Sequence, residues 1–237
     1  DEAWVQHLAK LESLKDFTPA VPDTLETELR DYQLEGYQWL CRLAEWGVGA
    51  CLADDMGLGK TIQSITYILW LRKNAEADSS KKKLGPALVV CPKSVLDVWA
   101  TEAGKFAPEL KVKVLRTRDD LDLKEVREEL DILVLNYAQL RVCGEELNKV
   151  RWLTVILDEG QQIKNPDSKA AKCARELDAE NRLVLTGTPI ENRLMDMWSL
   201  MAFAMPGVLG TRAYFKRRFD KRKDPSSQNR LAARLRP

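Results

Sequence analysis

Short apolar runs alternate with longer amphipathic segments along most of the chain. The runs are rich in Val, Ile and Leu, which is typical of strands buried on both faces of a parallel sheet. The segments between them are long enough for crossover helices, and residues 61–73 place apolar side chains at helical spacing. This alternation predicts a doubly wound α/β domain. The predicted strands are residues 49–53, 87–91, 111–115, 132–135, 153–157 and 183–185.

A helix is predicted directly after the run at residues 87–91. Ser94 is a residue type that favours the N-cap position. Val95, Val98 and Trp99 would then share the buried face of this helix.

Composition is that of a folded domain. The 237 residues are 45% hydrophobic and 31% charged, which is enough to build a sizeable core. The longest uncharged apolar stretch, residues 197–205, is far too short to cross a bilayer, so no membrane partner is expected. No basic-then-apolar secretory start is present. We therefore expect a soluble intracellular protein, cytoplasmic and nucleoid-associated in a bacterium or nuclear in a eukaryote.

Cysteine and histidine usage excludes several chemistries. The five cysteines form no CxxC pair, which argues against a disulfide framework or a zinc site. The chain has a single histidine, His7, which argues against a His-based metal site and against a Ser-His-Asp triad.

Charge is distributed unevenly along the chain. Residues 211–237 hold ten Lys and Arg against two Asp, whereas the first 210 residues hold 27 basic and 34 acidic side chains. A basic end on an otherwise acidic chain is consistent with a polyanionic partner. A solvated charged helix would have the same composition, so both interpretations stay open.

The segment DDMGLGKT at residues 54–61 carries the clearest candidate chemistry. It satisfies the phosphate-binding pattern GxxxxGK[ST] at Gly59, Lys60 and Thr61, with Asp54 in place of the first glycine. Glycines let backbone N–H groups face an anion, and the start of the following helix adds positive potential. Lys60 would reach the terminal phosphates of a nucleotide and Thr61 would bind Mg²⁺. A chance GKT in a turn is the alternative.

Two further polar segments follow predicted strands. Asp158 and Glu159 come directly after residues 153–157, where they could hold a metal ion and activate water, or simply be solvated acids. Thr186 and Thr188 follow residues 183–185 in a sequence that by itself would be an ordinary turn. Because all three polar segments stand at the carboxyl ends of predicted strands, they are expected to converge at one edge of the sheet.

The ordered motifs resemble the helicase-like ATPases of superfamily two, of the SWI/SNF type. The resemblance covers about residues 29–220, and the segments MPGVLG and YFKRRF are similar to bacterial, RapA-like or short SWI/SNF proteins. DEAD-box RNA helicases differ at DMGLGKT, IKN and TGTPIEN. The motifs that carry the resemblance are LRDYQ, DDMGLGKT, VVCPKSVLDVW, VLNYAQL, ILDEGQQIKN and LTGTPIENRL.

This resemblance implies a RecA-like lobe that uses ATP and Mg²⁺. Lys60, Asp158 and Glu159 would be catalytic, with Thr61 and Asp158 holding the metal. A second group of residues would lie along a DNA strand or couple nucleotide state to the DNA, although for Lys93 and Ser94 a turn with a helix cap would look the same. The expected nucleotide-binding residues are Arg30, Gln33, Met56, Gly57, Leu58, Gly59, Lys60 and Thr61, of which Gln33 would recognise adenine, and the expected nucleic-acid or coupling residues are Lys93, Ser94, Asn136, Tyr137, Thr186 and Thr188.

Two residues depart from the family pattern. Gly160 stands where the family usually has alanine, and we expect it to loosen the turn after the acidic pair. Asn136 stands where a threonine is common.

The resemblance also implies an organisation and partners. We predict a lead-in at residues 1–28, the nucleotide-binding lobe at 29–205, and the start of a basic helical insertion at 206–237. The expected partners are double-stranded DNA, contacted through its phosphates, a second RecA-like lobe of the same protein, and a DNA-bound protein complex. The expected function is ATP-driven translocation on duplex DNA that remodels or displaces protein–DNA complexes. An RNA helicase lobe and a nucleotide-dependent scaffold without hydrolysis are the alternatives.

Overall fold

The computed structural model describes residues 17–55, 57–77, 85–187 and 194–219. Within them, six strands form one sheet in the order β1-β6-β5-β2-β4-β3, and every neighbouring pair is parallel. The predicted parallel α/β sheet is therefore confirmed. The strands are β1 Ala50–Leu52, β2 Ala87–Cys91, β3 Val112–Leu115, β4 Ile132–Asn136, β5 Trp152–Leu157 and β6 Ala179–Leu185.

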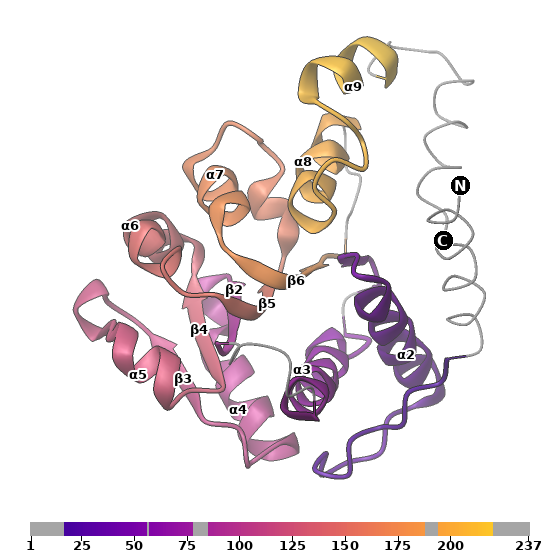
Figure 1. Ribbon diagram of the computed structural model, residues 1–237, viewed down its shortest axis with the longest axis vertical. Helices are drawn as coiled ribbons and strands as arrows, with labels where there is room; N and C mark the ends of the chain where they lie inside the picture. Colours follow the sequence, from indigo (N-terminus) through magenta and orange to yellow (C-terminus); the bar gives the residue numbers. More distant parts are fainter. Residues whose placement is uncertain (1–16, 56, 78–84, 188–193, 220–237) are drawn as a thin grey trace.

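Helices cover both faces of the sheet (Figure 1). One apolar cluster joins one face to α2, α3 and α4, and a second joins the other face to α6, α7 and α8. Strands β2, β4 and β5 are buried at every position, as expected for strands between two helical layers. The helices are α2 Asp31–Trp46, α3 Lys60–Ala77, α4 Leu96–Phe106, α5 Leu123–Glu128, α6 Tyr137–Leu147, α7 Lys169–Glu176, α8 Leu194–Ala204 and α9 Arg212–Phe219, with 3₁₀ turns η1 Lys93–Val95, η2 Arg118–Asp120 and η3 Gly160–Ile163.

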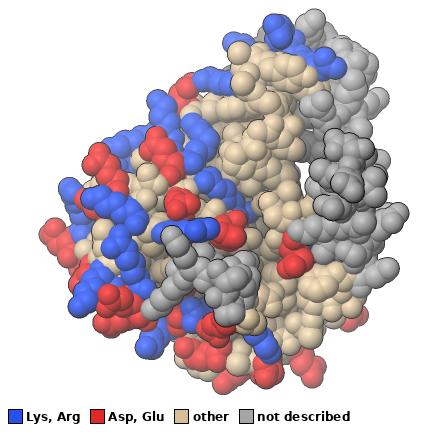
Figure 2. All heavy atoms as spheres, viewed as in Figure 1, with Lys and Arg blue, Asp and Glu red and all other residues tan. Residues whose placement is uncertain are grey.

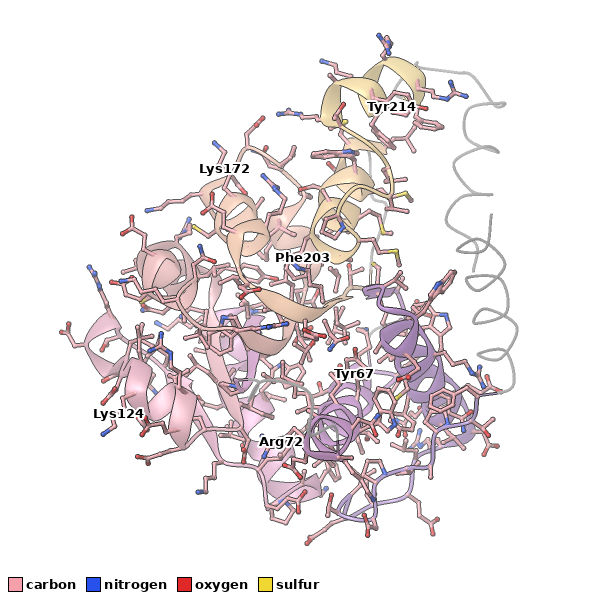
Figure 3. The ribbon with its side chains drawn as sticks, viewed as in Figure 1. Tyr67, Arg72, Lys124, Lys172, Phe203 and Tyr214 are labelled. Atoms are coloured by element: carbon pink, nitrogen blue, oxygen red, sulfur yellow. The ribbon has the colours of Figure 1, made fainter. Side chains whose placement is uncertain are left out.

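Strand β6 is longer than the apolar pattern predicts. Its first half contains Glu180, Asn181 and Arg182, which no run of apolar residues would reveal. Backbone pairing with β5 extends the strand, and Asn181 donates a hydrogen bond from Nδ2 to the Leu153 carbonyl at 3.0 Å. Arg182 donates to main-chain carbonyls and lies 5.3 Å from the ring of the buried Phe203, which faces the interior from α8 (Figure 3).

The start of α4 differs from the prediction. Ser94 lies inside η1, the N-cap position is Val95, and neither side chain caps the helix. The buried face is formed by Leu96, Trp99 and Ala103, whereas Val98 is 43% exposed. Because the 3₁₀ turn postpones the α-helix to Leu96, the predicted cap at Ser94 is wrong and Val98 faces outward. The predicted burial of Trp99 is confirmed, and Val95 packs against the core from η1.

The described contacts cross both predicted domain boundaries. Phe17, Val21 and Leu25 pack against the α2–α3–α4 side of the core, and the Tyr37 hydroxyl donates to the Ala20 carbonyl at 2.8 Å. At the other end, α9 packs on α8 through a small apolar cluster. The boundaries at residues 28 and 205 stay predictions, and residues 1–16 and 220–237 of the flanking segments lie outside the described residues.

Charged side chains of both signs are mixed over the α5–α7 side of the molecule, while the surface over α8 is mostly uncharged (Figure 2). The basic segment at residues 211–237 is described as far as Phe219, where α9 ends with Lys216, Arg217 and Arg218 in its last turn. No helix in the described part of the chain is long and apolar enough to cross a membrane.

Candidate active site

The described site residues meet at the carboxyl edge of the sheet on five consecutive strands. The P-loop follows β1, Thr186 follows β6, and Asp158 and Glu159 follow β5. Lys93 and Ser94 come just after β2, and Asn136 ends β4. The strand order therefore places Thr186 between the P-loop and the acidic pair, and the predicted nucleic-acid residues beside them. This edge is where parallel α/β sheets bind ligands.

The P-loop is held by its own lysine and by α2. The Lys60 ammonium donates to the carbonyls of Asp54 at 2.8 Å and Asp55 at 3.0 Å. Gly57 and Gly59 have φ values of +84° and +79°, which side-chain-bearing residues rarely adopt. With Lys60 as the first residue of α3, the loop presents a helix N-terminus to the site, which suits a phosphate group.

Gln33 connects α2 to this loop. Its Nε2 donates to the Leu58 carbonyl at 3.3 Å, and its Oε1 accepts from the Arg30 N–H at 3.0 Å. A Cβ at Gly59 would lie 2.4 Å from Gln33 Nε2, so the glycine is required for this contact. A primary amide keeps a second N–H and a second lone pair, which are the groups that an adenine edge requires. Adenine recognition by Gln33 and Arg30 stays a prediction, and Met56 lies outside the described residues.

Asp158 is fixed at every polar atom. Its N–H donates to the Val90 carbonyl at 2.8 Å, and its own carbonyl accepts from the Tyr137 hydroxyl at 2.7 Å. In the carboxylate, Oδ1 accepts from the Glu159 N–H and Oδ2 from the Trp99 indole N–H, each at 2.9 Å. Burial is the largest effect on this carboxyl group and raises its pKa, while the hydrogen bond from Trp99 acts in the opposite direction.

Glu159 has an unusual backbone conformation. With φ of +50° and ψ of +55°, it is the one non-glycine residue with positive φ in the described part of the chain. Such a conformation costs about 1–3 kcal/mol and persists where the surroundings impose it, often at functional sites. Gln161 donates from Nε2 to Glu159 Oε2 at 2.7 Å, and Thr186 donates from Oγ1 to Gln161 Oε1 at 3.1 Å. The end of β6 is thus connected to the second acid through one amide side chain.

The remaining predicted residues have varied environments. Lys93 and Ser94 are exposed on η1 and available to a ligand. Asn136 accepts from the N–H groups of Ala138 and Gln139, so its side-chain oxygen caps α6. Tyr137 is largely buried against Asp158. Their role along a DNA strand stays a prediction, and Thr188 lies outside the described residues.

The sequence analysis predicted no role at this site for two residues of α4. Trp99 contacts the Asp158 carboxylate, and Glu102 lies one turn later on the same helix. Burial raises the pKa of the Glu102 carboxyl, and a hydrogen bond with the Thr61 side chain opposes that shift. The available signal was that Trp99 ends the segment VVCPKSVLDVW, with Glu102 one helical turn later.

The residues present suit a Mg²⁺–nucleotide. No group of three or more His, Cys, Asp or Glu side chains could hold a metal among the residues described. Mg²⁺ is commonly bound through one or two protein oxygens together with substrate phosphates, so Thr61 and Asp158 match that mode. A buried carboxylate beside a phosphate-binding loop fits the same requirement.

Gly160 does not loosen the turn as expected. It is buried, and a Cβ at this position would lie 2.3 Å from Val184 Cγ1. Valine is stiff at χ1 and is fully buried here, so it cannot turn aside freely. The glycine therefore permits close packing of η3 on β6.

We expect Gly160→Ala to lower the free energy of unfolding by about 1–3 kcal/mol through overpacking against Val184. Urea unfolding of the single variants and of the Gly160→Ala/Val184→Ala pair would measure this. The second substitution makes room for the new methyl group. The double variant should therefore lose less free energy of unfolding than the sum of the losses in the two single variants. Additivity within about 0.5 kcal/mol would contradict the contact.

Comparisons with known proteins agree with this geometry. The family model described as SNF2-related domain matches residues 32–237. The TATA-binding protein-associated factor MOT1 of Saccharomyces cerevisiae is 40% identical over 208 residues, covering 85% of this chain and 11% of that protein. The putative ATP-dependent helicase/translocase YwqA of Bacillus subtilis is 39% identical over 225 residues, covering 92% of this chain and 24% of that protein.

A solved structure shows the same fold. The Sulfolobus solfataricus SWI2/SNF2 ATPase core in complex with dsDNA superposes with a TM-score of 0.81 at 39% identity, covering 92% of this chain and 45% of that one. The chain spans a quarter or less of these two curated relatives and under half of this structure. The family match, the identities and the shared fold together show that the chain belongs to the SNF2-related family of ATPases.

Proposed function

We propose that this chain is the ATP-binding lobe of a DNA-dependent ATPase that translocates on double-stranded DNA and remodels or displaces protein–DNA complexes. The observation that carries the proposal is the arrangement at the carboxyl edge, where Lys60, Thr186 and the acidic pair follow three consecutive strands. The names of relatives such as MOT1 and YwqA support it.

The chain's own residues divide the chemistry among them. Lys60 would exchange its loop carbonyls for the terminal phosphates of ATP, and Thr61 and Asp158 would hold Mg²⁺. When bound, Mg²⁺ would neutralise negative charge on the phosphates. Glu159, oriented by Gln161, would accept a proton from the attacking water. Because Gln161 also accepts from Thr186, a movement at the end of β6 would change the position of that acid.

For the DNA, we propose contacts through phosphates at the edge formed by Lys93, Ser94 and Asn136. Cys91 and Asn136 are paired in register across β2 and β4, so these segments lie side by side. Phosphate contacts carry little sequence information, and weak sequence preference is expected. The RNA helicase alternative predicts a preference for RNA, and the scaffold alternative has no use for a water-activating acid such as Glu159.

Replacing Lys60 with alanine should weaken ATP and ADP binding about 10- to 100-fold, since a hydrogen bond to a charged group contributes about 1.5–3 kcal/mol. Titration calorimetry with Mg²⁺ and each nucleotide measures the loss. Lys124→Ala is the matched control, because Lys124 is exposed on α5, away from α3 and the P-loop (Figure 3). Equal binding by wild type and Lys60→Ala would contradict the assignment of the loop.

A further inference from the structure

The Asp158 carboxylate is oriented by two donors of different origin. The Glu159 N–H belongs to the same turn and donates to Oδ1. The Trp99 indole donates to Oδ2 from α4, the helix that follows β2. With the local donor alone, the carboxylate could still rotate about its Cβ–Cγ bond. The second donor, on the opposite oxygen, fixes the plane of the group.

Trp99 is itself well held. Its side chain is 1% exposed and belongs to the apolar cluster that joins α2, α3 and α4 to the sheet. The indole offers a single N–H and no acceptor, so it has one way to satisfy its polar atom in this environment. That N–H donates to Asp158 Oδ2 at 2.9 Å.

The chemistry of the donor suits a metal-binding carboxylate. An Arg or Lys at this position would orient Asp158 but would also neutralise it and repel a cation. The neutral indole orients the carboxylate and leaves its negative charge for Mg²⁺. Partners in this outer shell commonly alter metal affinity about 10- to 100-fold when they are removed.

We propose that Trp99 is a positioning residue that sets the orientation of the Asp158 carboxylate for Mg²⁺. This inference rests on the proposed nucleotide site. It assigns to Trp99, the last residue of the segment VVCPKSVLDVW, a role beyond its predicted place on the buried face of the helix. Trp99 contacts neither nucleotide nor metal in this role and acts only through Asp158.

The test compares Trp99→Phe with Trp152→Phe in the complete chain. Trp152 is also fully buried, and its indole donates to the Leu147 carbonyl at 3.0 Å, but it lies at the opposite end of β5 from Asp158. Both variants lose one buried indole hydrogen bond and keep an aromatic ring. Binding of a fluorescent ADP is titrated in EDTA and again at increasing Mg²⁺.

Trp99→Phe should raise the Mg²⁺ concentration that gives half of the maximal increase in ADP affinity about 10- to 100-fold. The affinity for ADP in EDTA should be unchanged. Trp152→Phe should match wild type in both measurements. Wild-type Mg²⁺ dependence in Trp99→Phe, or an equal loss with and without Mg²⁺, would overturn the positioning role. A wild-type chain that binds no ADP would instead overturn the proposed nucleotide site, and this inference with it.

A second measurement does not depend on a variant that folds. In the ¹⁵N spectrum of the ADP-bound wild-type chain, added Mg²⁺ should shift the indole N–H resonance of Trp99 and leave that of Trp152 in place. An unmoved Trp99 resonance at saturating Mg²⁺ would overturn the proposal.

Discussion

A chain extended beyond Pro237 through a second RecA-like lobe should hydrolyse ATP about 10³- to 10⁵-fold faster than the 237-residue chain, with both saturated with duplex DNA. Phosphoryl transfer needs an oriented water and positive charge around the transferred group. Lys60, Thr61, Asp158 and Glu159 supply these on one side of the nucleotide. We propose that an arginine of the expected second lobe supplies positive charge on the other side.

Phosphate release from the two chains, each with and without duplex DNA, measures the difference. Glu159→Gln in the extended chain is the control, and its hydrolysis should fall to a small fraction of wild type because the proton acceptor is lost. A 237-residue chain as fast as the extended one, with activity abolished by Glu159→Gln, would show that one lobe is sufficient.

The same assay separates the proposed partner from its alternatives. Stimulation of the extended chain by duplex DNA of unrelated sequences would support translocation on DNA through phosphate contacts. Stimulation by RNA in place of DNA would favour the RNA helicase alternative. Nucleotide binding without hydrolysis under any of these conditions would favour the scaffold.

Much of the architecture could be predicted because its determinants are local. A strand buried on both faces must be largely apolar, so β2, β4 and β5 are visible as nearly continuous apolar runs. Strands β1 and β3, at the two edges of the sheet, are visible as shorter runs. The sixth, β6, was found only at its apolar end, since its polar half is held by backbone pairing and by side chains such as Asn181. The glycine-rich loop and the acidic pair were likewise placed at the ends of β1 and β5 from the sequence, and their roles stay predictions.

What could not be predicted depends on neighbours that are distant in sequence. Trp99 and Asp158 are 59 positions apart, and nothing local indicates that β2 and β5 are adjacent. The restriction at Gly160 arises from Val184 on β6, so the sequence alone could not show that the glycine allows η3 to pack closely on that strand. The later start of α4 has a local cause. A short polar sequence such as Lys93-Ser94 suits both a 3₁₀ turn and a helix cap, so the sequence could not distinguish the two.

The largest stability effect is expected from Gly49→Ala. A Cβ at Gly49 would lie 2.0 Å from the Ala204 carbonyl oxygen and 2.7 Å from that of Arg182. Both obstacles are main-chain atoms, at the end of α8 and within β6, so no side-chain rotation can relieve the clash. Overpacking typically costs 1–3 kcal/mol and occasionally more, and we expect about 3 kcal/mol or more here.

Urea unfolding of Gly49→Ala should therefore show a much lower midpoint with an unchanged slope. Gly104→Ala is the matched control: Gly104 lies within α4, and nothing stands within 4 Å of the added Cβ. That variant should gain about 0.5–1 kcal/mol from the better helix former. Because Gly49 directly precedes β1 and the P-loop follows that strand, nucleotide affinity should also fall in Gly49→Ala but not in Gly104→Ala. A Gly49→Ala chain that unfolds at the wild-type urea concentration would mean that β1 does not approach the end of α8 as closely as the structure shows.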